Sequence, residues 1–109
     1  MKSVKIPKTV KIGGKNFKVV SIANKAFAGT KVQKVVINSN VEIIGANAYR
    51  GCRKLSTITI RSTKLKSIGK DAFKGISKTA KIIVPSKCLF VYKKLLKNKG
   101  QSNKVKINY

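Results

Sequence analysis

Residues able to do acid–base chemistry near neutral pH are scarce in this sequence. Its 109 residues include no histidine and only two carboxylates, Glu42 and Asp71. General acid–base catalysis near neutral pH usually needs a histidine or a pair of carboxylates in unlike environments. Glu42 and Asp71 fall at different points of the chain's internal repeat, so nothing in the sequence pairs them. We therefore predict that the protein is not an enzyme.

Cys52 and Cys88 are the only cysteines, and they do not form a CxxC pair. Without histidine, a tetrahedral zinc site would lack half of its ligands, so we expect no metal and no cofactor. Two cysteines also permit one disulfide, which would fit a secreted protein. The interpretation that we favour for Cys52 is a small buried apolar residue.

The charge of the chain is strongly positive, with 26 lysines and arginines and a formal net charge of +24. Such a surface repels other copies of itself and attracts polyanions, so we expect a monomer. Binding of nucleic acid is one alternative, because lysines that neutralise phosphates give salt-dependent, sequence-blind affinity. Arginine is rare and the lysines are scattered, so we do not expect a specific nucleic-acid site.

The elements that must position any binding residues are set by an internal repeat. An isoleucine, three residues and then Ala-aromatic-x-Gly occur three times. The blocks are Ile22, Ala26, Phe27, Gly29; Ile44, Ala48, Tyr49, Gly51; and Ile68, Ala72, Phe73, Gly75. The alanines are 22 and then 24 residues apart, a period typical of stacked solenoid coils. We therefore predict an aromatic column of Phe27, Tyr49 and Phe73, and a second column of Thr30, Cys52 and Ile76.

A second apolar pattern, LxxIxI, lies between these blocks. Two sets have this spacing, Val32, Val35, Ile37 and Leu55, Ile58, Ile60. A third set, Ala80, Ile82 and Val84, has its first member one residue closer to the second. Alternation of this kind predicts strands with one buried face. The glycines after the aromatic residues are expected at sharp turns that require a positive φ.

The combined pattern resembles the BspA-type leucine-rich repeat, whose motif reads roughly LxxIxIPxxVxxIGxxAFxGCxxL. The clearest copy runs from Val41 to Ile60, and the resemblance covers about residues 19 to 85. It implies a β-rich repeat solenoid, a right-handed β/α superhelix of about three coils. It also implies a C-terminal segment of a bacterial cell-surface or secreted protein, with an extracellular protein, an anionic glycan or a cell-wall polymer as its partner and adhesion as one role.

We expect one domain, residues 1–109, with a hairpin cap at 1–19, repeats at 20–85 and a second cap at 86–109. In the first cap, runs at 10–12 and 17–20 flank Gly13-Gly14-Lys15, a hairpin signal. The second cap is expected to hold a helix with Ser86 as its N-cap, ending at Gly100, and then a strand at 105–107. The apolar residues at helical spacing are Cys88, Leu89, Tyr92, Leu95 and Leu96.

No apolar run is long enough to span a membrane. The first residues, Met-Lys-Ser-Val-Lys-Ile-Pro, lack the apolar stretch of a signal peptide, which taken alone predicts the cytoplasm. An excised domain would also begin directly with a strand-like segment. The resemblance to surface proteins instead implies a secreted or cell-surface location.

Two groups of residues are candidate contacts. By the resemblance, ligands meet the outward residues of the repeat strands, which are Lys34, Val36, Asn38, Thr57, Thr59, Arg61, Lys81 and Ile83. The alternative is that these are only good strand formers. The densest basic cluster, expected on the outer side of the last helix, is Lys93, Lys94, Lys97 and Lys99. It is either a solvated face or a contact with an anionic polymer or membrane surface. A purely structural spacer remains a third hypothesis.

Overall fold

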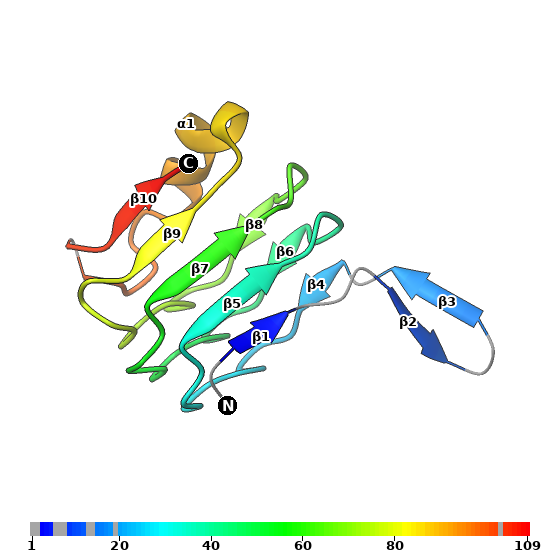
Figure 1. The fold of residues 1–109 in the computed structure, drawn as a ribbon, viewed down its shortest axis with the longest axis horizontal. Helices are drawn as coiled ribbons and strands as arrows, with labels where there is room; N and C mark the ends of the chain where they lie inside the picture. Colours follow the sequence, from blue (N-terminus) through cyan, green and yellow to red (C-terminus); the bar gives the residue numbers. More distant parts are fainter. Residues whose placement is uncertain (1–2, 6–8, 13–14, 19, 103) are drawn as a thin grey trace.

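The computed structural model describes residues 3–5, 9–12, 15–18, 20–102 and 104–109. Its largest feature is a five-stranded sheet in which every strand pair is parallel (Figure 1). In spatial order its strands are β1 (Ser3–Lys5), β5 (Lys34–Ile37), β7 (Thr57–Ile60), β9 (Lys81–Ile83) and β10 (Lys106–Asn108). A smaller parallel sheet joins β4 (Ser21–Ile22), β6 (Ile43–Ile44) and β8 (Ser67–Ile68). Each coil therefore runs through the large sheet, the small sheet and a row of turns.

The strands of the large sheet pair in register, so equivalent repeat positions lie side by side. Val35, Ile58 and Ile82 are register partners on neighbouring strands, and at most 1% of each is exposed. Leu55, Ile37 and Ile60 are buried with them in one apolar core. The alternation predicted from the LxxIxI pattern is confirmed, because β5, β7 and β9 bury every second residue.

The predicted aromatic column is also confirmed. The ring centroids of Phe27 and Tyr49 are 5.3 Å apart, and those of Tyr49 and Phe73 are 5.6 Å apart. Both pairs are stacked, with interplanar angles of 3°. Next to this column, the Cys52 thiol donates a hydrogen bond to the carbonyl of Phe27 at 2.9 Å. Equivalent residues of successive coils thus touch, as the stacking of coils requires.

The row of turns explains two kinds of glycine. Gly51 and Gly75 have φ values of 79° and 83°, which favour glycine over residues with a Cβ. Gly69 has a different reason, because a Cβ on it would lie 2.2 Å from the backbone nitrogen of Ala46 in the preceding coil. The coils touch through their backbones here. For example, the N–H of Tyr49 donates to the carbonyl of Ala72 at 2.8 Å.

The N-terminal segment forms both a strand of the solenoid and a hairpin. β1 pairs with β5, so residues 3–5, which we assigned to the cap, are a strand of the large sheet. β2 (Thr9–Ile12) and β3 (Lys15–Lys18) pair antiparallel, with residue 12 opposite residue 15. Gly13 and Gly14 of the predicted turn lie outside the described residues. Figure 1 shows the hairpin apart from the two parallel sheets, and its role as a cap stays a prediction.

The C-terminal segment differs in detail from the sequence prediction. A 3-10 turn (Ser86–Cys88) leads into a short helix, α1 (Leu89–Leu95). Pro85 is the N-cap and no side chain caps the turn, so the prediction of Ser86 as N-cap was wrong. The last strand is Lys106–Asn108, one residue later than predicted, and it pairs parallel with β9.

The apolar residues of the helical segment pack as predicted. Tyr92 and Leu96 are buried in the core, and Cys88, Leu89 and Leu95 are partly buried against it. The Tyr92 hydroxyl donates to the carbonyl of Ser62 at 2.7 Å and accepts from the N–H of Leu65 at 3.0 Å. The helix is therefore tied by hydrogen bonds to the loop that follows β7.

Tyr49 provides a stability prediction. Its hydroxyl is fully buried and has no hydrogen-bond partner among the described residues, and burial raises the pKa of this phenol above its ordinary value. Because an unsatisfied buried hydroxyl is destabilising, Tyr49→Phe should raise the free energy of unfolding by about 1 kcal/mol. Urea unfolding followed by circular dichroism measures the change, and a loss of stability would contradict this interpretation.

The same substitution at Tyr92 should have the opposite effect. Tyr92→Phe removes the donor to Ser62 and the acceptor for Leu65 while keeping the ring in place. Because both backbone groups then stay buried without this partner, the free energy of unfolding should fall by about 1–3 kcal/mol. Tyr49→Phe is the matched control in the same urea titration. Equal effects of the two substitutions would show that the hydrogen bonds do not matter.

Candidate functional site

The outer face of the large sheet, which we call the strand face, carries two rows of side chains. The first row is Lys34, Thr57, Lys81 and Lys106, which are register partners on β5, β7, β9 and β10. The second row is Val36, Thr59, Ile83 and Asn108. A row of mainly cationic side chains thus lies beside a row that is mainly β-branched.

In the first row, the distances between the charged side chains are set by the separation of the strands. Neighbouring strands lie about 4.8 Å apart, so Lys81 and Lys106 are adjacent and Lys34 is separated from Lys81 by one threonine. The three lysines are exposed, and Arg61, one residue beyond β7, is exposed as well. No residue of the two rows is acidic. These charges can therefore attract an anionic group of a ligand without competition from a carboxylate on the same face.

Lys106 and Asn108 were absent from the sequence prediction of the strand face. Their strand lacks the leading part of the LxxIxI pattern, and we assigned it to a cap. The alternation of Val105 and Ile107 with polar residues was the signal that could have placed them there.

Asn38 does not belong to the strand face, contrary to prediction. It follows β5 and is only 4% exposed. Its side-chain oxygen accepts a hydrogen bond from the N–H of Asn40 at 2.6 Å, which shapes the turn after the strand. An asparagine that makes such a local bond is a turn residue, so its amide is not offered to a ligand.

The predicted basic cluster does not form one face of a helix. Lys93 and Lys94 lie in α1, and the Lys94 ammonium sits 4.4 Å from the centroid of the Phe90 ring. The helix ends before Lys97 and Lys99. Lys99 is half-buried, and its carbonyl accepts a hydrogen bond from the N–H of Phe73 at 3.0 Å. The backbone at Lys99 thus continues the row of turns.

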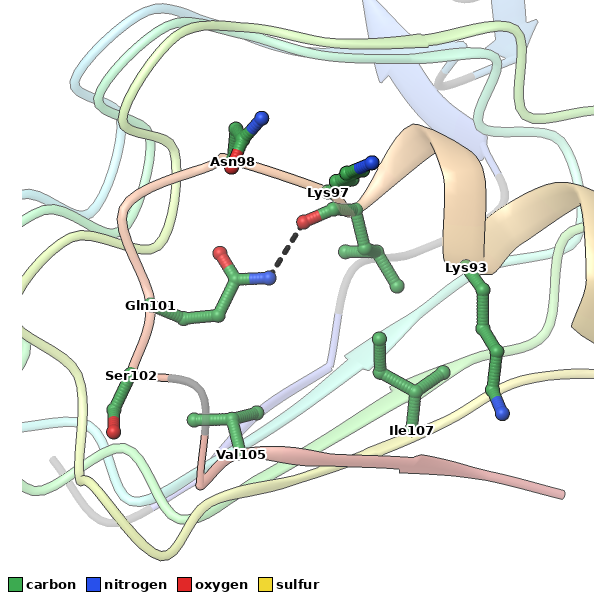
Figure 2. A pocket seen from close by; sticks show the side chains of 8 residues that line it. Lys93, Lys97, Asn98, Gln101, Ser102, Val105 and Ile107 are labelled. Carbon is green, nitrogen blue, oxygen red and sulfur yellow. Dashed lines mark hydrogen bonds between the residues drawn. The ribbon is translucent and has the colours of Figure 1, made fainter.

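A cavity of about 370 Å³ lies between α1 and β10 (Figure 2). Leu96, Val105 and Ile107 form its apolar part. Lys93, Lys97, Asn98, Gln101 and Ser102 complete the lining. The Gln101 amide nitrogen donates to the carbonyl of Leu96 at 2.6 Å, and its amide oxygen is buried without a partner among the described residues. The cavity combines apolar surface with two cations.

The two carboxylates, Glu42 and Asp71, lie in different local environments. Glu42 forms an ion pair with Lys66 at 2.9 Å, and this lysine holds the pKa of the carboxyl below its ordinary value. Asp71 lies in the row of turns with a φ of 57°.

Within the described part of the chain, no group of three His, Cys, Asp or Glu residues could hold a metal ion. Cys52 is buried and Cys88 is half-buried, and neither is in a disulfide.

The described helices include none with the length and apolar character needed to cross a membrane.

Short parallel strands in two sheets, joined by a row of turns with stacked aromatic residues, are the construction of a leucine-rich-repeat solenoid. The family described as "BspA type Leucine rich repeat region (6 copies)" matches residues 20–109, so the chain belongs to this family. Domains of this family are generally protein-binding modules of bacterial surface proteins and are typically not catalytic. No curated protein and no solved structure shows significant similarity to the chain.

Proposed function

We propose that this domain binds a protein with an acidic surface outside the bacterial cell, and that the strand face makes the contact. The carrying observation is the row of Lys34, Lys81 and Lys106, held in register on a rigid sheet beside Val36 and Ile83. A partner that places carboxylates opposite the lysines and apolar groups opposite the second row would match both rows. Family membership supports a protein partner and a secreted or surface location.

The strand face suits recognition because its side chains are positioned by backbone pairing. Sites built on strands are held more rigidly than sites on loops, so less conformational entropy is lost when a ligand binds. Thr57 and Thr59 are half-buried and add hydroxyl groups to the centre of the face. Lysine ammonium groups at the edge of an interface mainly raise the rate of association and select for an acidic partner.

Binding of any polyanion through the overall charge is the competing explanation. The formal net charge of +24 attracts heparin or nucleic acid wherever lysines are exposed. Generic attraction of this kind depends on the number of charges and not on their position. A comparison of variants with equal charge but different location therefore separates the two explanations.

The test uses the double variant Lys34→Glu/Lys81→Glu on the strand face. Its retention on immobilised matrix glycoproteins and mucin, at about 0.15 M salt, should fall at least about tenfold, because two cations facing the partner become repulsive. Surface plasmon resonance measures the retention, with heparin as the polyanion comparator.

Lys70→Glu/Lys74→Glu is the matched control, because both lysines are exposed and lie in or next to the row of turns. It changes the net charge equally and should leave binding to the protein ligands within about threefold. An equal loss in both double variants would contradict a role for the strand face. Failure of the unmodified domain to bind any of the protein ligands would count against the proposed function itself.

A further inference from the structure

The large sheet has an open edge at β10. The N–H of Lys106 donates to the carbonyl of Ala80 at 3.1 Å, and the carbonyl of Asn108 accepts from the N–H of Val84 at 2.8 Å. Both residues therefore use their backbone groups toward β9. In a parallel ladder, successive residues direct these groups alternately to the two sides, so the N–H and C=O of Ile107 point away from β9. No described strand pairs with that side of β10 (Figure 1).

The cavity lined by Leu96, Val105 and Ile107 lies next to this edge. Ile107 continues the inner row of Ile58 and Ile82, one strand further along the sheet. If another parallel strand were added in register, its inward side chains would lie beyond Ile107, against the wall that Leu96 and Val105 provide. The same place therefore offers backbone partners for a strand and apolar surface for its inward side chains.

Cations surround this edge. Figure 2 shows Lys93 extending from α1 toward the strand that carries Ile107, and Lys97 also lines the cavity. Lys106 is exposed on the outer side of β10, where it would neighbour the outward residues of an added strand. No carboxylate lines the cavity. An added strand with acidic outward residues would be attracted here, and one with basic residues would be repelled.

We propose that β10 and its cavity bind an extended acidic segment of a partner protein, which adds to the large sheet as a further parallel strand. Its aliphatic residues fill the cavity, which Lys93 also lines, and its alternate, acidic residues lie beside Lys106 on the outer side of β10. Addition of a strand to a sheet edge uses main-chain hydrogen bonds for affinity and the adjacent pocket for specificity. The edge shares Lys106 with the strand face, but the backbone groups of Ile107 and the cavity lie outside the two rows, so this binding does not depend on the function proposed above.

A second copy of this chain is a poor occupant of the edge. The chain has two carboxylates against 26 lysines and arginines, and the two end strands of its large sheet, β1 and β10, carry Lys5 and Lys106 at outward register positions. Pairing of either end strand of a second copy with β10 would add further lysine to an edge that already carries Lys106. The occupant is therefore an acidic chain and not another molecule of this protein.

The test uses the full chain and the peptide acetyl-Glu-Ile-Glu-Val-Glu-amide. In the arrangement proposed, the glutamate N–H groups point to β10, as the N–H of Lys106 points to β9. N-methylation of the glutamate nitrogens should weaken binding at least about tenfold at about 0.15 M salt. N-methylation of the isoleucine and valine nitrogens, which point away from β10, should leave the affinity within about threefold. Isothermal titration calorimetry measures all three affinities.

Two further comparisons identify the cause of binding. A scrambled peptide, acetyl-Glu-Glu-Glu-Ile-Val-amide, has the same charge without the alternation and should bind at least about tenfold more weakly. The variant Lys93→Gln/Lys106→Gln should weaken binding of the alternating peptide, whereas Lys31→Gln/Lys54→Gln, which removes equal charge from earlier coils, should not.

The proposal is overturned if the scrambled peptide binds equally well, if the two N-methylated peptides behave alike, or if the alternating peptide shows no saturable binding. Binding of a heparin fragment that Lys93→Gln/Lys106→Gln weakens, with no binding of the alternating peptide, would assign the edge to a glycan instead.

Discussion

The whole structure depends on the requirement that each coil be covered by the next. A single coil has too few apolar residues to enclose itself, so its buried surface exists only where a neighbour is stacked on it. Two kinds of interaction stabilise the stacking. Backbone hydrogen bonds such as that between Tyr49 and Ala72 join successive coils, and so does the column of stacked rings of Phe27, Tyr49 and Phe73. Both need equivalent residues to stay in register, which explains why the repeat is visible in the sequence.

This requirement also decides what the sequence could predict. One aromatic residue and one LxxIxI pattern in each coil are periodic, so the core and the outward positions of β5, β7 and β9 followed from spacing. The interpretation of those positions as ligand contacts came from the family resemblance. Asn38 was placed wrongly, because it lies after the end of β5, where its buried side chain accepts a hydrogen bond from the N–H of Asn40. The helix was predicted too long. The helical propensity of residues 96–99 competes with the backbone hydrogen bond from the N–H of Phe73 to the carbonyl of Lys99. That bond draws the chain back to the row of turns, with Asn98 and Gly100 at positive φ.

The charge of the chain affects its surface and not its core. With one described ion pair, between Glu42 and Lys66, the fold relies on apolar burial and backbone pairing. Exposed lysines then repel each other across the surface, which disfavours association between copies of the chain. We propose that they act in specific recognition only where the backbone fixes their spacing, as on β5, β9 and β10. Position therefore carries more information about function than the net charge does.

The end of such a stack differs from its middle in the pairing of its backbone groups. A coil in the middle has both of its backbone edges paired, but a terminal strand leaves one row of N–H and C=O groups open, and natural proteins usually protect such edges with charge. Lys106 and Lys93 do this at β10, since they repel the basic strands of another copy. The same charges do not repel an acidic strand, and the cavity beside Ile107 accepts the side chains that such a strand would bury. An edge protected by one sign of charge is therefore selective for chains of the opposite sign.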